Sequence, residues 1–250
     1  MKIIVFNLAR HKLIKICVSL LLIVTVIIST TVGISMNIYS QSLTDVYTNT
    51  LPYEKIIILD AGHGGEDPGA VAQNGVMEKD LNLQLTLEIG KALEEKGYIV
   101  VYTRTDDRLL YKEEENIKGI RKISDLKNRC EIAKRYPDSI FVSIHMNSFG
   151  SSKYSGLQVY YSNSNSQSQI LANSIQNKVI KDLQASNTRV TKPGKDMYIL
   201  ENITNTAVLI ECGFLTNNDE LKKLSEKEYQ KQLSFSIVCG IIEYIENNNI

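Results

Sequence analysis

Two histidines lie where side chains of this kind can bind a metal ion. His63 comes shortly after the apolar run Ile56–Leu59, and His145 comes directly after the largely apolar run Ser139–Ile144. A single histidine at the end of a strand is more often a structural hydrogen-bonding group, but two near one sheet edge favour a metal site. Two imidazoles and one carboxylate bind zinc and leave a fourth position open for water. Such an ion polarises a carbonyl group and lowers the pKa of the water toward ~7.

Spacing alone does not choose the carboxylate that would complete this site. Glu66 and Asp67 lie next to His63 on a glycine-rich loop, whereas Glu78 opens a predicted helix, which is a stiffer support. An acid in the first turn of a helix can also serve only to complement the helix dipole. All three acids therefore remain candidates from the local sequence.

Glu211 is a further acid at the end of an apolar run, Val208–Ile210. A charge in that position is costly unless it is paired or lies near a metal. A metal hydrolase also needs a carboxylate that is not a ligand, to take a proton from water and pass it to the leaving nitrogen. The alternative is a structural glutamate held in a salt bridge.

Periodicity predicts strands that alternate with helices. The predicted strands are Lys55–Asp60, Tyr98–Arg104, Ser139–His145, Gly156–Ser162, Met197–Leu200 and Ala207–Cys212, with a turn at Lys192–Lys195. The predicted helices are Glu78–Lys96, one from Ser124 or Asp125 to Arg135, Gln167–Leu183, Asp219–Leu224 and Glu226–Glu246. This alternation predicts an α/β fold with a mostly parallel, twisted sheet and helices on both faces.

The predicted topology brings the chemical groups together. In open parallel sheets, ligands bind beyond the carboxyl ends of the strands. His63, His145 and Glu211 all lie at or just after such ends. We therefore expect them to converge at one edge of the sheet.

The composition bounds the class of partner. The only charged residues before Asp45, apart from His11, are Lys2, Arg10, Lys12 and Lys15. The rest of the chain has 24 basic and 28 acidic residues. A body with this acidic excess is not expected to bind nucleic acid. The dispersed Cys130, Cys212 and Cys239 form neither a disulfide framework nor a zinc motif, and small buried side chains are expected there.

The N-terminal region predicts export. Ile16–Ile34 has no charge and would span about 28 Å as a helix, with positive charge only on its N-terminal side. We expect a membrane anchor or cleaved signal over residues 1–36, a polar linker over 37–53 and one catalytic domain over 54–250. The body would then be exported and lie at the outer face of the cytoplasmic membrane or beyond it. A retained anchor is favoured because no alanine lies between Ala9 and Ala61 to form the usual cleavage site.

Five motifs in order make the chain resemble a known enzyme family. They are Leu59-Asp60-Ala61-Gly62-His63-Gly64-Gly65, Glu78-Lys79-Asp80-Leu81-Asn82-Leu83, Thr103-Arg104, Ser143-Ile144-His145-Met146-Asn147-Ser148 and Glu211-Cys212-Gly213-Phe214-Leu215-Thr216-Asn217. Together they resemble the zinc-dependent N-acetylmuramoyl-L-alanine amidases of the amidase-3 type. The resemblance covers about residues 55–245. One departure is Asn205-Thr206, where many relatives have a proline.

The resemblance implies roles for individual residues. It makes His63, Glu78 and His145 the ligands of one zinc ion and Glu211 the catalytic glutamate. Arg129, ahead of the third predicted strand, also matches a family position, and we expect it to be structural and ion-paired. The implied reaction is hydrolysis of the amide between the lactyl group of N-acetylmuramic acid and the L-alanine that begins the stem peptide of peptidoglycan.

Within the family, the chain looks most like the CwlD amidases of spore-forming bacteria, which act on spore-cortex peptidoglycan during sporulation and germination. The resemblance would place the body in the cell-wall or spore-cortex space. The expected partners are peptidoglycan and, through the N-terminal segment, the membrane. Control by an accessory protein and the oligomeric state both stay open. The alternative function is a non-catalytic, membrane-anchored module that binds the wall and recruits other enzymes.

Overall fold

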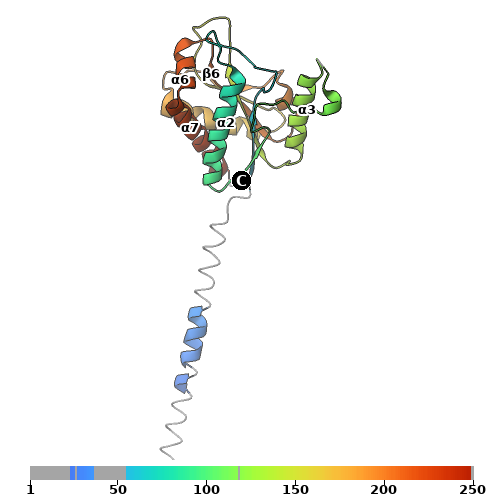
Figure 1. Ribbon diagram of the computed structural model, residues 1–250. Coiled ribbons are helices and arrows are strands. Elements are labelled where there is room, and N and C mark those ends of the chain that lie inside the picture. Colours follow the sequence, from blue (N-terminus) through green and yellow to red (C-terminus); the bar gives the residue numbers. More distant parts are fainter. Residues whose placement is uncertain (1–22, 26, 37–54, 118, 249–250) are drawn as a thin grey trace, which may run out of the picture. The chain divides into compact units, whose positions relative to one another are not determined.

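The computed structural model describes residues 23–25, 27–36, 55–117 and 119–248 (Figure 1). Residues 23–25 and 27–36 are helical. Among the described residues, no helix combines the length and the apolar character needed to cross a bilayer. The expected linker 37–53 lies outside the described residues, as does most of the expected anchor or signal segment 1–36.

The described strands of the body form a single six-stranded sheet. They are β1 (Ile56–Ala61), β2 (Ile99–Tyr102), β3 (Ile140–Asn147), β4 (Gln158–Tyr161), β5 (Lys192–Pro193) and β6 (Thr206–Phe214). The spatial order is β2-β1-β3-β6-β4-β5. Neighbouring strands are parallel except β4 and β6, which are antiparallel. The predicted α/β fold with a mostly parallel sheet is confirmed.

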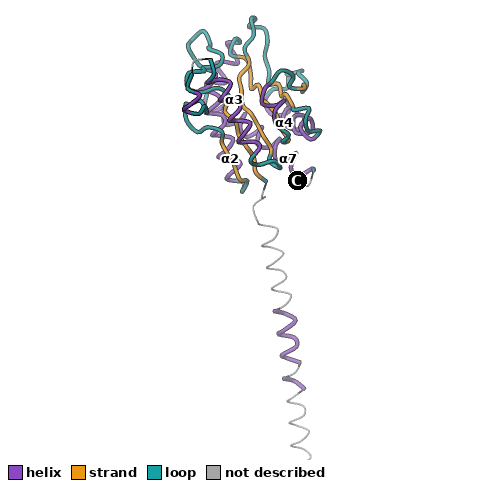
Figure 2. Tube along the Cα trace, turned by 90° about the vertical axis from the view of Figure 1, so that its right-hand side faces the viewer, coloured by secondary structure: helices purple, strands orange, loops and turns teal. Residues whose placement is uncertain are grey.

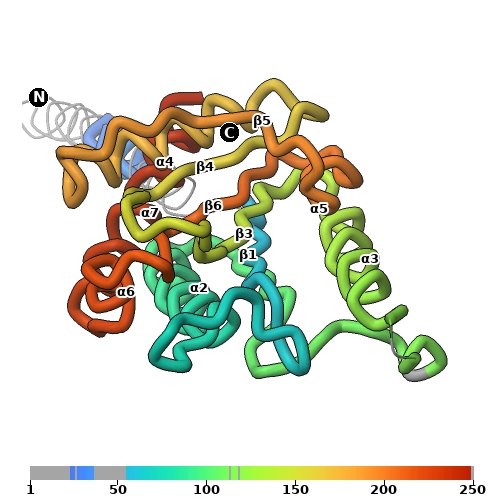
Figure 3. The backbone as a smooth tube through the Cα atoms, turned by 90° about the horizontal axis from the view of Figure 1, so that it is seen from above, coloured from blue at the N-terminus to red at the C-terminus, as the bar shows by residue number. Residues whose placement is uncertain are grey.

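Helices cover both faces of this sheet (Figures 2 and 3). They are α2 (Glu78–Glu95), α3 (Arg121–Lys134), α4 (Gln167–Leu183), α5 (Tyr198–Asn202), α6 (Asn218–Ser225) and α7 (Lys227–Asn247), with a 3₁₀ turn at Glu113–Glu115. One apolar cluster packs α2, α4, α6 and α7 against one face, and a second packs α3 and α5 against the other. Figure 3 shows the row of strands between these two groups of helices.

Strand β1 shows why both faces must be covered. Ile57 and Leu59 belong to the first apolar cluster and Ile58 to the second, and all three are fully buried. Successive side chains of a strand point to opposite faces, so an unbroken apolar run needs helices on both sides. Helix α2 in turn buries its predicted apolar stripe and ends two residues before Gly97, whose φ of +88° suits glycine.

The prediction of a strand over Met197–Leu200 is wrong, because this segment contributes to the helix α5. Both Ile199 and Leu200 pack into the second apolar cluster. A strand would turn one of these adjacent side chains away from that cluster, whereas a helix turn keeps both on it. The predicted turn at Lys192–Lys195 instead contains β5, which extends the sheet by pairing with β4.

Candidate metal centre and active site

Two buried arginines fix the loop that carries His63. Arg104 donates from Nε to the carbonyl oxygen of Ala61 at 2.9 Å and from Nη2 to that of Gly62 at 3.0 Å. Arg129 donates from Nη1 to Ala61 and from Nη2 to the carbonyl of His63, each at 2.7 Å. His63 has a φ of +61°, which is uncommon for a residue other than glycine. The bonds to three successive carbonyls hold this backbone conformation in place.

Asp60 balances the charge of Arg129 in the interior. Its fully buried carboxylate accepts hydrogen bonds from Arg129 Nη1 at 2.5 Å, Thr103 Oγ1 at 2.7 Å and Ser143 Oγ at 2.6 Å. Burial alone would raise the pKa of Asp60, but Arg129 and the two hydroxyls outweigh burial and keep it below its ordinary value of 3.8. Arg129 also donates from Nε to Asp125 at 2.8 Å. The predicted ion-paired role of Arg129 is confirmed.

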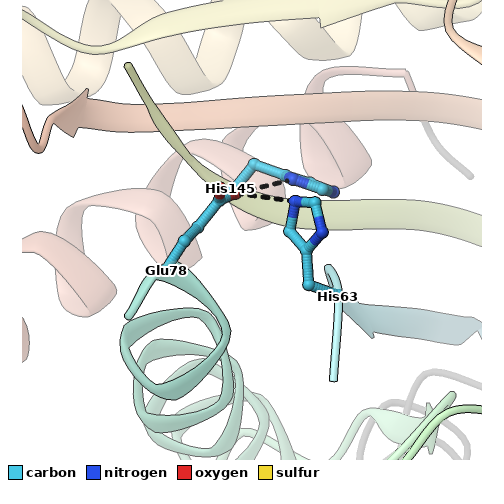
Figure 4. A group of neighbouring side chains, drawn as sticks. All are labelled: His63, Glu78 and His145. Carbon is cyan, nitrogen blue, oxygen red and sulfur yellow. Dashed lines mark hydrogen bonds and ion pairs between the residues drawn. The ribbon is translucent and has the colours of Figure 1, made fainter. Parts of the chain in front are cut away.

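His63, Glu78 and His145 come together from three different elements (Figure 4). The Oε1 atom of Glu78 lies 3.2 Å from Nε2 of His63 and 3.0 Å from Nδ1 of His145. One potential ligand atom from each residue lies within 4.8 Å of the other two. Zinc ligands at about 2.0–2.1 Å from the ion in a tetrahedron lie roughly 3.3 Å apart. The cluster therefore has the size and the donor types of a zinc site.

Glu78 is held rigidly at the first turn of α2. Its Oε1 accepts a hydrogen bond from the amide of Met146 at 3.1 Å, and its Oε2 accepts one from the amide of Ala70 at 2.8 Å. Burial would raise the pKa of Glu78, but the hydrogen bonds with His145 and His63 keep it well below its ordinary range. The carboxylate is thus charged and fixed, at a helix end that favours negative charge.

The other two acids near His63 have different partners. Glu66 is paired with Arg121. The Nδ1 atom of His63 lies 2.9 Å from Asp67 Oδ2, so Asp67 contacts the ring nitrogen other than the one near Glu78. A carboxylate in that position orients a metal-binding imidazole. Burial would lower the pKa of His63, but Asp67 and Glu78 outweigh burial and raise it to about 9, so the cluster attracts positive charge.

Glu211 lies beside the cluster on β6. It is the register partner of His145 in the parallel β3–β6 pair, which places both side chains on one face of the sheet. Its Oε2 atom is buried and has no hydrogen-bond partner, and no ion pair of Glu211 occurs within the described chain. The salt-bridged alternative is therefore not supported. Burial outweighs the effect of the His145 imidazole and raises the pKa of Glu211 to about 7, which suits a group that exchanges protons near neutrality.

The spacing of possible metal ligands does not reveal three residues that support the site, Asp60, Arg104 and Gly62. Asp60 ends the apolar run of β1, and a buried acid in that position signals the need for a cation. Arg104 follows β2 in a similar way and is 1 % exposed. Gly62 packs against His145, because a Cβ at this position would lie 2.2 Å from Cε1 and Nε2 of the imidazole.

The sequence profile of the Amidase_3 family, described as N-acetylmuramoyl-L-alanine amidase, matches residues 57–243. The chain belongs to this family. The matched segment runs from β1 into α7 and includes all four predicted site residues. Membership explains why the two histidines and two glutamates occur in this order on these elements.

The similar proteins include a germination-specific amidase and a CwlD amidase of known structure. The chain is 35% identical over 190 residues to the germination-specific N-acetylmuramoyl-L-alanine amidase of Bacillus subtilis, covering 76% of this chain and 79% of that protein. It is 42% identical to the CwlD amidase from Clostridioides difficile, solved in complex with the GerS lipoprotein, with a TM-score of 0.75 and coverage of 78% and 100%. AmiC2 of Nostoc punctiforme is 30% identical, with a TM-score of 0.67 and coverage of 77% and 97%.

These relationships identify the chain as a hydrolase that acts on cell-wall peptidoglycan, an N-acetylmuramoyl-L-alanine amidase. The prediction of an enzyme is confirmed, and so is the resemblance to the CwlD group. This outcome does not support the alternative of a non-catalytic wall-binding module.

The Arg129→Met substitution tests the role of the buried ion pair. It leaves the charge of Asp60 without its cation in a fully buried site, so we expect a loss of roughly 3–5 kcal/mol in the free energy of unfolding. Denaturant titration followed by circular dichroism measures this loss. Lys134→Met is the control, because Lys134 pairs with Glu131 on the surface of the same helix and its removal should change stability little. Equal midpoints for both variants would contradict the assignment.

The same pair predicts an acid limit for stability. Because the pKa of Asp60 is lower in the folded than in the unfolded chain, its contribution is complete above about pH 4 and is lost as the pH falls further. In Asp60→Asn, this part of the pH dependence should disappear. The free energy of unfolding of both proteins is measured from about pH 2 to about pH 7. If Asp60 did not contribute, the two pH profiles would be parallel.

Proposed function

We propose that this amidase binds one zinc ion through His63, Glu78 and His145 and uses Glu211 as its general base. The reaction is hydrolysis of the amide between the lactyl group of N-acetylmuramic acid and L-alanine. The observation that carries the proposal is the convergence of a compact two-histidine, one-carboxylate cluster with an unpaired buried acid on the adjacent strand.

The donor set fits zinc and leaves one coordination position open for water or substrate. Three protein ligands with an open position are typical of catalytic zinc sites, whereas structural sites use four. Zinc bound there would act as a Lewis acid toward the substrate carbonyl and would make water more acidic. Asp67 keeps the His63 ring oriented through Nδ1, and the backbone amides of Ala70 and Met146 orient Glu78.

Glu211 acts as the general base and then as the general acid in this proposal. Its carboxylate takes the proton of the attacking water and later gives it to the nitrogen of L-alanine, which leaves as an amine. Burial without a salt bridge keeps the affinity of Glu211 for a proton high enough for both steps. A nearby cation favours the charged form and prepares the group to act first as a base.

We further propose that the amidase acts on spore-cortex peptidoglycan outside the cytoplasmic membrane. The germination-specific relative and the CwlD structure support this role. The complex of that CwlD with the GerS lipoprotein supports an accessory partner for this chain as well. Residues 1–36 would direct export and anchor the chain, 37–53 would link, and 54–250 would form the catalytic domain, as the uncharged run Ile16–Ile34 favours.

Digestion of purified peptidoglycan tests the proposed reaction. The body from Thr44 onward should release stem peptides with a free N-terminal L-alanine, as identified by mass spectrometry. A chelator should abolish release, and added zinc should restore it. Cut glycan strands, cleaved stem peptides or lost acetyl groups would instead indicate another class of wall hydrolase, and full release without bound metal would exclude the zinc mechanism.

The Glu211→Gln substitution separates the base from the ligands. Glutamine fills the same space but does not accept a proton, so we expect kcat to fall about 10²–10⁴-fold while the zinc content stays that of the wild type. Metal analysis and turnover are measured on the same preparation. Glu131→Gln, an exposed change on α3, is the control. Full activity in Glu211→Gln with zinc bound would exclude Glu211 as the base.

Gly62→Ala tests the placement of His145. The new methyl group would overlap the imidazole at 2.2 Å, so the ring must move and zinc content should fall together with activity. Gly150→Ala is the matched control, because nothing lies within 4 Å of a Cβ at that position. Normal zinc content in Gly62→Ala would contradict the ligand role of His145.

A further inference from the structure

A row of polar side chains crosses the sheet at the candidate active site. His145 on β3 is the register partner of Glu211 on β6, and Glu211 is the register partner of Gln158 on β4. Directly opposite residues of neighbouring strands point to the same face. The row therefore extends past Glu211, on the side away from His63 and Glu78. Gln158 is 2 % exposed, so its polar group lies inside the protein beside the site.

Gln158 holds a cation at the end of this row. Its Oε1 accepts a hydrogen bond from Nη1 of Arg189 at 3.0 Å, and its Nε2 donates to the carbonyl of Val190 at 2.8 Å. Tyr160 also donates to Oε1 of Gln158, at 3.3 Å. A buried amide with both ends engaged is a fixed support. The loop between α4 and β5 is thereby attached to the strand that flanks Glu211.

Three contacts fix the orientation of the Arg189 side chain, but no carboxylate of the described chain neutralises its charge. Its Nε donates to the carbonyl of Ser155 at 2.8 Å, and its guanidinium carbon lies 4.6 Å from the centre of the Phe214 ring. Within the described chain it has no carboxylate at ion-pair distance, and Nη2 has no acceptor. The buried Arg129, by contrast, meets two carboxylates. Arg189 also lines a cavity of about 440 Å³ together with Tyr154 and Asn187.

The acids that line this cavity do not take up the charge of Arg189. Glu220 accepts hydrogen bonds from the amides of Gly156 and Phe214, both at 2.8 Å. Asp219 lies in the first turn of α6 and forms no ion pair with Arg189. A guanidinium that is fixed, partly exposed and without a counter-ion is a ready-made site for a carboxylate, since its planar fork binds both oxygens.

We propose that Arg189 binds a carboxylate of the stem peptide, one or two residues beyond L-alanine, and so selects the peptide side of the substrate. This inference rests on the proposed function. His145 and Gln158 lie on the first and third of three adjacent strands, and two spacings of about 4.8 Å put them roughly 10 Å apart. Three residues of extended peptide, L-alanine and the two that follow it, span about 10 Å. A peptide whose first amide lies at the cluster therefore reaches Arg189 with the residues that follow L-alanine.

Paired synthetic substrates test this role. Each pair of muramoyl peptides differs only in one carboxylate, which is free in one member and a carboxamide in the other. One pair changes the acidic residue after L-alanine, and the other changes the C-terminal carboxylate. With the wild-type zinc-loaded enzyme and Arg189→Gln, kcat and KM are measured for all four substrates.

We expect Arg189→Gln to lower kcat/KM about tenfold to a hundredfold for a free carboxylate, mainly through KM. The matching carboxamide should show a change of about twofold or less. Arg189→Lys should recover part of the loss, because it keeps the charge but not the planar fork. The pair that responds identifies which carboxylate is bound.

Controls distinguish a loss of carboxylate binding from a loss of folding and from failure of the proposed reaction. Lys192→Gln removes an exposed cation three residues away and should leave all four rates unchanged. Thermal melts of each variant check folding. An equal loss on both members of each pair, or no loss at all, would overturn the role of Arg189. Failure of the wild type to cleave any muramoyl amide would instead overturn the proposed function.

Discussion

The buried pairing of Asp60 with Arg129 is the interaction on which the site depends. It allows a guanidinium to stay in the interior, where that group reaches the carbonyls of Ala61 and His63. Arg104 completes the arrangement from the end of β2. A loop of small residues has few apolar contacts of its own, so these charge-assisted bonds replace packing as the source of rigidity. The positive φ of His63 is a direct result of that support.

The same sheet separates an apolar core from a reactive edge. Along β3 and β6, residues that face the first apolar cluster are fully buried hydrophobic side chains, whereas His145 and Glu211 point to the opposite face where the strands end. Burial raises the pKa of Glu211, and hydrogen bonding lowers that of Glu78. Two neighbouring glutamates are thus given opposite proton affinities, as the proposed roles of Glu78 as a ligand and Glu211 as a base require.

The proposed base and the proposed peptide contact share one structural element. Strand β6 carries Glu211 and, three residues later, Phe214, whose ring lies against the guanidinium of Arg189. The antiparallel strand β4 joins the two through Gln158. Paired strands, with no loop between them, thus connect Glu211 with Gln158 and with the proposed peptide contact.

The sequence by itself determined the places of the four longer parallel strands and of the long helices along the chain, the sheet edge at which His63, His145 and Glu211 meet, and the motifs of the family. These follow from apolar periodicity and from short motifs, which are local properties. Spacing left Glu66, Asp67 and Glu78 open, and the family motifs selected Glu78. Only the tertiary structure showed that Asp67 contacts the other nitrogen of His63, made Met197–Leu200 part of a helix, and attached Arg189 to Gln158 on the strand next to Glu211. Those outcomes depend on contacts between residues far apart in the chain, and neither spacing nor local propensity encodes such contacts.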